Sequence, residues 1–339
     1  MHESLHRDPR DVVWNMLANP DYALEMDPQP YREFATETDE HQWQDFMSGN
    51  WAWNQADKIS DDPDTHSSTF VPVILGSDKT TVSVATGQND YYPLYASIRN
   101  VRNNVHRAHR NAVAVIGFLA MPKTTKQHAK TANFHNFRRQ LFHSSLSYIL
   151  KNLKPAMMKP EIARFGDGHY RCVIYGLGPY IANYEEQVLL VCIVKNWCAK
   201  CLLYRKSLDD DSLQRSRTHT EALIEECNHL ALWDEFGIAA QLVPFTNDFP
   251  RTDIHELIAP DLLHQIIKGA FKVLRRMSRA DWDDLTVTIT TVISRAESPR
   301  SASTEEQKLR TFAEANDDSG LQAEGVSSPS EGTDLMSSR

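Results

Sequence analysis

The amino-acid sequence predicts an α/β fold, a mixed β-sheet with flanking helices. Short apolar runs rich in β-branched residues, typical of buried strands, recur between residues 70 and 181. Longer segments between residues 133 and 275 place apolar residues on one side of a helix. Of the 339 residues, 41% are hydrophobic and 24% are charged, an average composition for a protein with a globular core.

The predicted elements follow a particular order along the chain. We expect strands at about residues 70–76, 80–86 and 112–120, then a helix at 133–152, then a fourth strand at 171–181. Three strands, a helix and another strand is the order of a ribonuclease H-like core. This core is the fold that we predict.

The remaining segments are less regular. Residues 184–195 fit either a buried helix or a fifth strand, and periodicity does not choose between them. We expect amphipathic helices at 212–230 and 255–275 and a last strand at 281–293. Residues 294–339 are rich in Ser, Glu, Asp and Gly, so we expect them to be disordered because they offer little apolar surface to bury.

Composition divides the chain into three parts. Residues 1–64 form an acidic, Trp-rich segment, in which Trp51 and Trp53 are expected to pack onto the core. Residues 65–275 form a partial ribonuclease H-like core with a Cys-x-x-Cys insertion, and residues 276–339 a tail outside it. The sequence has neither an apolar stretch of about 18 residues nor a signal peptide, so we expect an intracellular protein without membrane contact. Its cysteines are then thiols or metal ligands rather than disulfides.

The net charge of −9 is distributed unevenly. Residues 1–65 hold 15 acidic and 4 basic residues, whereas residues 91–160 hold 12 basic residues and no acidic one. The basic segment suits contact with DNA phosphates; alternatively, it folds against the acidic segment and neutralises it. The candidate DNA contacts are Arg99, Arg102, Arg107, Arg110, Arg138 and Arg139.

Asp78 follows a predicted buried strand. A carboxylate at the exit of such a strand is held rigidly, which suits metal chemistry. The alternative is an Asp that stabilises a turn with its own side chain.

The Cys198-x-x-Cys201 pair has the spacing that tetrahedral zinc accepts. Cys192 and His219 are the residues that would complete a structural zinc site. Unliganded thiols and a redox pair are the alternatives.

Two further segments hold candidate site residues. Asp261 and His264 share one face of the predicted helix 255–275, where Asp261 also suits the helix N-terminus. Asn183 follows the fourth strand, where a ribonuclease H-like core has its second metal carboxylate, and Glu185 and Glu186 lie close by.

These motifs together resemble a known family. In chain order they are Leu75-Gly-Ser-Asp78-Lys-Thr, Tyr180-Ile-Ala-Asn183-Tyr-Glu-Glu-Gln187, Cys198-Ala-Lys-Cys201 and Ala259-Pro-Asp261-Leu-Leu-His264-Gln. The chain resembles the Plavaka-type transposases of fungal DNA transposons, relatives of the CACTA-like cut-and-paste transposases, over about residues 51–272.

The resemblance implies a transposase core in which carboxylates bind two divalent metal ions, Mg²⁺ or Mn²⁺. These ions activate water or a DNA 3′-hydroxyl to attack a phosphodiester. Asp78 matches the first carboxylate position, and Asp261 with His264 matches an Asp-x-x-His signature. The implied partner is DNA at transposon ends, the implied compartment is the nucleus, and an assembly of identical chains is a further expectation.

Two departures from the family predict lost catalysis. Asn183 replaces an Asp, and an amide binds a hard cation less well than a carboxylate does. Beyond Lys272 the sequence no longer follows the family, whose catalytic Glu comes later, and the polar tail positions none of its own glutamates.

Our first hypothesis is therefore a truncated, degenerate transposase fragment that is unable to cleave or join DNA. One alternative is a non-catalytic DNA-binding protein that uses residues 91–160. The other is the non-functional product of a decayed transposon gene. Whether Glu185 or Glu186 replaces the missing acid stays open.

Overall fold

A computed structural model of the chain describes residues 6–83, 89–107, 111–204, 206–207 and 210–261. All of them lie in Met1–Phe271, the first of two units into which the chain divides. None of the helices in this described part is long and apolar enough to cross a membrane.

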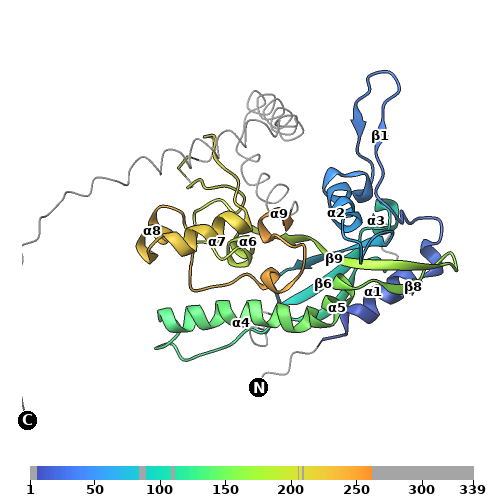
Figure 1. The fold of residues 1–339 in the computed structure, drawn as a ribbon. Coiled ribbons are helices and arrows are strands. Elements are labelled where there is room, and N and C mark those ends of the chain that lie inside the picture. The colour runs from blue at the N-terminus through green and yellow to red at the C-terminus, as the bar shows by residue number, and fades with distance from the viewer. Residues whose placement is uncertain (1–5, 84–88, 108–110, 205, 208–209, 262–339) are drawn as a thin grey trace, which may run out of the picture. The chain divides into compact units, whose positions relative to one another are not determined.

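The centre of the fold is a mixed six-stranded sheet in the order β10-β9-β3-β6-β7, with β8 also paired to β9 (Figure 1). β3 runs parallel to β9, and β9 parallel to β10, whereas the β3–β6, β6–β7 and β8–β9 pairs are antiparallel. The strands are β3 (Thr69–Ser77), β6 (Pro93–Ile98), β7 (Ala114–Phe118), β8 (Glu161–Arg164), β9 (Tyr170–Ala182) and β10 (Ile258–Pro260). The predicted α/β class with a mixed sheet and flanking helices is confirmed.

The second strand of this sheet differs from the prediction. The segment expected at 80–86 forms β4 (Thr80–Ser83), which pairs with β5 (Asn89–Tyr91) in a separate two-stranded sheet. β6 takes its place beside β3. The prediction missed β6 because Pro93 and Ser97 interrupt its apolar pattern, although a proline is tolerated at the first position of a strand.

Helix α4 (Ala132–Leu150) covers one face of the sheet, as Figure 1 shows, and confirms the predicted helix at 133–152. The Thr131 side chain caps it by accepting from the Phe134 N–H. Phe142, Leu146 and Ile149 are buried on its inner side, each worth about 1.5–3 kcal/mol of transfer free energy. The chain then passes through η3 (Lys151–Leu153) and α5 (Lys154–Met158) into β8.

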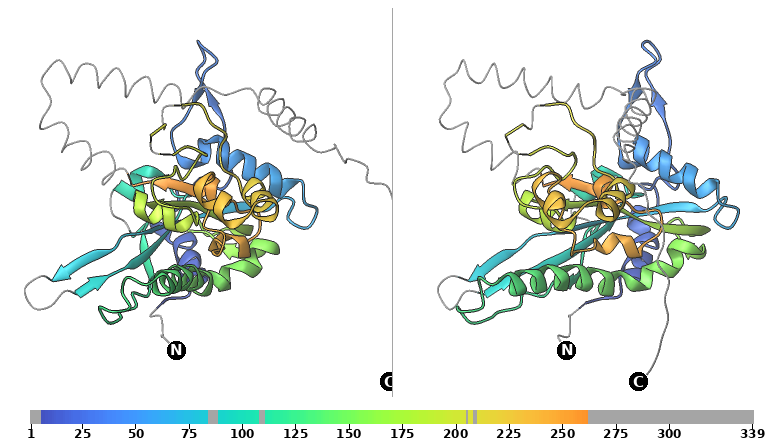
Figure 2. Two further views of the ribbon diagram at one scale, coloured as in Figure 1. Left: turned by 90° about the vertical axis from the view of Figure 1, so that its left-hand side faces the viewer. Right: turned by 60° about the vertical axis from the view of Figure 1, so that its left-hand side comes forward.

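The acidic N-terminal segment contributes to the same core. Helix α1 (Pro9–Leu17) places Val13 and Leu17 in the cluster of the central strands. Helix α2 (Asn50–Ser60) packs Trp51 against Phe70 of β3, with ring centroids 6.1 Å apart, as predicted. The two-stranded hairpin of β1 (Glu33–Phe34) and β2 (His41–Gln42) extends away from the sheet (Figures 1 and 2). Short 3₁₀ turns and one short helix complete this half: η1 (Pro20–Tyr22), η2 (Phe46–Ser48) and α3 (Asn103–Arg107).

Between β9 and β10 the chain makes a largely helical excursion. Its helices are α6 (Tyr184–Leu190), α7 (Arg217–Glu226), α8 (His229–Asp234), η4 (Phe245–Asp248) and α9 (Ile254–Leu257). The segment that fitted helix or strand is thus the helix α6. The predicted helix 212–230 is instead two helices, because the Asn228 side chain caps a new one at α8.

The predicted helix 255–275 is wrong at residues 258–260. Helix α9 ends at Leu257, and residues 258–260 pair with β9 as the strand β10. The remainder of that helix, the strand expected at 281–293 and the tail lie outside the described residues.

Candidate active site and nucleic-acid interface

The fold brings three predicted site residues to one edge of the sheet. Gly76 of β3 and Ala259 of β10 both pair with Ile181 of β9, in parallel ladders. Parallel strands present their carboxyl ends at the same edge. Two residues beyond this row, each of the three strands reaches a predicted site residue: Asp78, Asn183 and Asp261, respectively.

The two aspartates of this row are fixed by local hydrogen bonds. Asp78 Oδ2 accepts from the Thr80 hydroxyl at 3.4 Å, and the neighbouring Lys79 forms an ion pair with Asp90 at 2.9 Å. The backbone N–H of Asp261 donates to the Ala182 carbonyl oxygen at 3.1 Å. Each aspartate is therefore held close to the end of a paired strand.

Asn183, between them, has a structural role. Its side-chain oxygen accepts from the Glu186 N–H at 3.1 Å and caps the N-terminus of α6. An N-cap of this kind stabilises a helix by about 1 kcal/mol. The amide oxygen of Asn183 is thus already engaged in a hydrogen bond within the fold.

Glu186 is one of the two glutamates that the sequence left open as replacements for the missing acid. It is only 5% exposed, and its Oε1 accepts from the hydroxyls of Ser77 and of Tyr92, the latter at 2.7 Å. The Ser77 hydroxyl in turn lies 2.6 Å from that of Tyr180. Glu185, the neighbour with which Glu186 was grouped, is exposed and pairs with Lys195. Helical periodicity, once α6 is known to be a helix, separates the two.

The charge state of Glu186 reflects its burial and its neighbours. Burial first, and then the negative charges of Asp78 and Asp261, raise the pKa of Glu186 to about 7, against the hydrogen bonds from Ser77 and Tyr92, which lower it. Both aspartates are therefore within electrostatic reach of this carboxyl group.

The donor set at this edge does not make a complete metal centre. Carboxylate oxygens are the ligands that Mg²⁺ and Mn²⁺ prefer, and Asp78 and Asp261 supply them. However, no group of three or more His, Cys, Asp or Glu side chains in the described residues is placed to hold a metal ion. His264, the other half of the Asp-x-x-His motif, lies outside those residues.

No three of the predicted zinc ligands form a group placed to hold a metal ion in the described part of the chain. Cys192 is buried, with its Sγ 3.2 Å from His143 Nε2, and burial raises the pKa of its thiol. His143 Nδ1 accepts from the Phe245 N–H, so Nε2 is the protonated nitrogen, and burial lowers the pKa of this histidine to about 4. Cys192 is thus a packed thiol beside a neutral imidazole.

The Cys198 and Cys201 side chains remain neighbours. Burial first, and then the hydrogen bond with Cys198, raise the pKa of Cys201 to about 11. Arg215 Nε donates to the carbonyl oxygens of both cysteines at 3.0 Å and so links the two ends of the Cys-x-x-Cys segment. His219 lies in α7, and its pKa is lowered by burial and by the charge of Arg215. Zinc at the cysteine pair stays a prediction.

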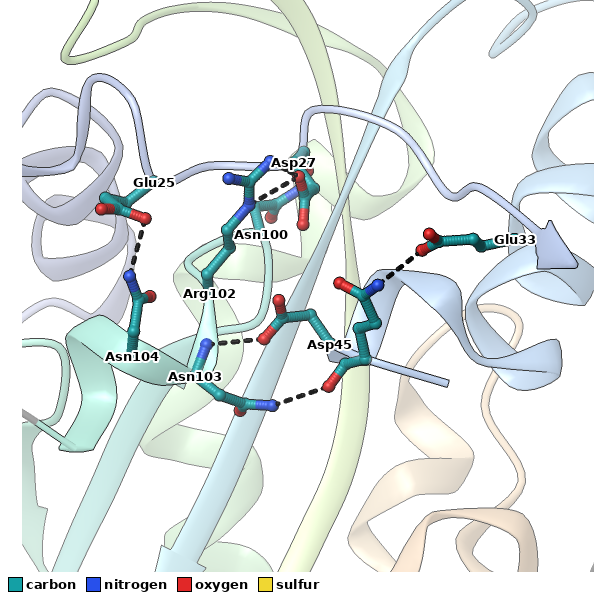
Figure 3. Close-up of polar contacts among 9 residues, drawn as sticks. Glu25, Asp27, Glu33, Asp45, Asn100, Arg102, Asn103 and Asn104 are labelled. Carbon is teal, nitrogen blue, oxygen red and sulfur yellow. Dashed lines mark hydrogen bonds and ion pairs between the residues drawn. The ribbon is translucent and has the colours of Figure 1, made fainter. Parts of the chain in front are cut away.

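Two of the predicted DNA-binding arginines are used within the fold. Figure 3 shows Arg102 against Asp27, whose Oδ1 accepts from Nε at 3.1 Å and from Nη2 at 2.9 Å. Arg99 is half-buried and donates to Asn103 at 3.3 Å, and burial lowers its pKa. For Arg102, neutralisation by the acidic segment is the interpretation that the structure supports.

The same close-up shows further contacts of this kind. The Asn103 N–H donates to Asp45 at 2.7 Å, and the Asn104 side chain donates to Glu25 at 2.8 Å (Figure 3). The side chain of Arg107 and the whole of Arg110 lie outside the described part of the structure.

Arg138 and Arg139 are placed differently, in the wall of a cavity of about 750 Å³ between α4 and α6. Lys123 lines the same cavity. Two other lysines of this cavity pair with acidic residues, Lys79 with Asp90 and Lys195 with Glu185. Lys123, Arg138 and Arg139 have no ion-pair partner among the described residues, so the cavity has a surplus of positive charge.

Comparison with known proteins agrees with the motifs. The family model described as Plavaka transposase matches residues 1–275, about four fifths of the chain. No curated protein matches the sequence. Because the match extends over the sheet, the row of Asp78, Asn183 and Asp261, and the basic cavity, the chain belongs to the Plavaka transposase family.

Proposed function

We propose that this chain binds duplex DNA along the basic cavity and does not cut it. The absence of cutting rests on Asn183, which occupies the middle of the carboxylate row and serves as the cap of α6. The binding rests on the surplus of positive charge in the cavity. The DNA ligand that the family suggests is a transposon end, and the compartment is the nucleus.

The sheet supports a ribonuclease H-like core as the scaffold. Its first three strands, β3, β6 and β7, are successive antiparallel neighbours. After α4 and the short strand β8, β9 returns parallel to β3 on the other side. This order agrees with the predicted three strands, helix and strand, except that β6 replaces the segment at 80–86 and the short strand β8 is added.

Binding is expected through phosphate contacts. Arg138, Arg139 and Lys123 offer three positive charges within one cavity, and each phosphate they neutralise releases counterions. The cavity also contains Tyr92, whose hydroxyl donates to Glu186, so it borders the carboxylate edge. DNA held there would have its backbone beside Asp78.

The loss of cutting follows from the charge of the site. Two divalent metal ions carry a total charge of about +4. A metal-dependent nuclease balances this charge with carboxylates. Here the central position is neutral, and its oxygen already accepts a hydrogen bond. A cation at this edge is therefore bound by fewer anionic ligands than the family pattern provides.

The experiment is fluorescence anisotropy of a labelled DNA duplex at several salt concentrations. The double variant Arg138→Glu, Arg139→Glu should weaken binding and flatten the plot of log K against log salt concentration by about two phosphate contacts. The matched control reverses two exposed charges beside β8, Lys159→Glu and Arg164→Glu. Equal loss in both variants, or none in the first, would refute the cavity as the DNA interface.

A second candidate function is residual cleavage in which Glu186 replaces the missing acid. Its support is the position of Glu186, buried and within electrostatic reach of Asp78 and Asp261. Metal-dependent nicking by the wild-type protein that disappears in Glu186→Gln would favour this function over the first.

A further inference from the structure

Exposed aromatic rings gather beside the carboxylate edge. Tyr91 of β5 is 50% exposed, Phe118 of β7 is 40% exposed, and Tyr95 of β6 is 36% exposed. The Tyr91 and Phe118 rings touch edge to face, with centroids 5.9 Å apart. Large aromatic side chains usually bury most of their surface, so an exposed group of three suggests a ligand.

Strand pairing places these rings close to Asp78. Tyr91 pairs with Thr80, two residues after Asp78. Phe118, the last residue of β7, pairs with Pro93, the first residue of β6. The rings therefore stand at the same end of the sheet as the row of Asp78, Asn183 and Asp261.

The rings point away from α4. Side chains alternate along β6, so Tyr95 and Pro93 face the side opposite to Leu94 and Ala96, which lie in the same core cluster as Phe142 of α4. Phe118 pairs with Pro93, and the Tyr91 ring touches Phe118, so these two rings lie on the side of Tyr95. Tyr92 contacts Phe142 of α4, with ring centroids 6.0 Å apart. The aromatic rings thus flank the carboxylate edge on one face of the sheet, and the basic cavity flanks it on the other.

We propose that Tyr91 and Phe118 form a stacking platform for an unpaired base of DNA whose phosphates lie in the basic cavity. This inference rests on the proposed DNA binding and adds a substrate class, a duplex with an unpaired end. Aromatic side chains stack on every base, whatever the sequence. The surplus of positive charge at Lys123, Arg138 and Arg139 lies across the carboxylate edge from the rings, on the other face of the sheet, and favours a polyanion over a protein as the occupant.

The test compares two DNA probes, a blunt duplex and the same duplex with a three-nucleotide single-stranded extension. The full chain should bind the extended probe at least about fivefold more tightly, since stacking of one base on aromatic residues is worth about that factor or more. The double variant Tyr91→Ala, Phe118→Ala should lose this preference and keep the affinity for the blunt duplex. Tyr91→Phe with Phe118→Tyr should retain the preference.

A second readout reports stacking directly. A 2-aminopurine in the unpaired extension should change its fluorescence on binding to the wild-type protein and not on binding to the alanine variant. Tyr170→Ala is the control, because Tyr170 is exposed at the opposite end of β9.

The outcomes separate the two proposals. Absence of binding to either probe would refute the proposed DNA binding itself. Equal binding of both probes by the wild-type protein would leave DNA binding intact and overturn the stacking platform. Loss of self-association in the alanine variant, with DNA preference unchanged, would assign the rings to contact with a second copy of the chain and also overturn it.

Discussion

The buried carboxyl group of Glu186 should make the stability of this protein depend on pH, and Glu186→Gln should remove that dependence. Gln has the shape of a protonated Glu and keeps an oxygen that accepts from Ser77 and Tyr92. It cannot ionise, so neither the cost of burying a charge nor the repulsion from Asp78 and Asp261 acts on it.

The magnitude follows from the pKa of Glu186. Folding raises it from the ordinary value of 4.5 to about 7, and one pKa unit is worth about 1.4 kcal/mol. The wild-type protein thus favours the protonated form, with this contribution fully present below pH 4.5 and lost as the pH rises through about 7. Relative to Glu186→Gln, the wild-type protein should lose about 3 kcal/mol of unfolding free energy over this window.

The assay is urea unfolding followed by tryptophan fluorescence at several pH values from 4 to 8 for both proteins, with unfolding free energies from linear extrapolation. Subtracting one profile from the other cancels the other titrating groups. The control Glu185→Gln removes an exposed carboxylate paired with Lys195, and its stability profile should run parallel to that of the wild-type protein, because solvent screens exposed ion pairs. Parallel profiles for the wild-type protein and Glu186→Gln would refute the reasoning.

Three further predictions concern Arg102, two cysteines and Asn183. Arg102→Ala should destabilise the fold by about 1–2 kcal/mol in urea unfolding, because it leaves the buried Asp27 carboxylate without its guanidinium; an unchanged midpoint would count against a structural role. Cys172, which is exposed, should react with a thiol reagent in the folded protein while Cys192 does so only after unfolding, since burial raises the pKa of the Cys192 thiol; peptide mapping of the labelled protein decides, and equal labelling would contradict it. Asn183→Asp keeps a helix cap and adds a carboxylate to the row, so millimolar Mn²⁺ should raise the melting temperature of the variant and leave that of the wild-type protein unchanged.

The sequence predicted the long, continuously apolar elements better than the short strands. Asp78 was recognised as the exit of a buried strand because β3 is continuously apolar, and β9 and α4 were predicted for similar reasons. The strand β6 was missed because Pro93 and Ser97 break the pattern that tertiary pairing with β3 restores. The strand β10 was read as helix because its three residues carry almost no local signal; only the ladder to β9 defines it.

The site was predicted only in part, because local sequence patterns locate single residues whereas strand pairing decides which of them meet. The positions of Asp78, Asn183 and Asp261 came from motifs, but their common row depends on strand register, which a single sequence does not reveal. Glu186 was one of two adjacent glutamates until the helix α6 assigned one of them to the interior. Arg102 and Arg138 look alike in the sequence, and only the fold shows that the first meets Asp27 while the second lines a cavity.

The central claim, DNA binding without cutting, is tested most directly by incubating supercoiled plasmid with the purified protein and Mg²⁺ or Mn²⁺, and comparing the wild-type protein with Asp78→Ala. The account predicts the same low level of nicked plasmid for both. Nicking by the wild-type protein above that of Asp78→Ala would show that the edge with Asn183 still supports catalysis, and would contradict the account.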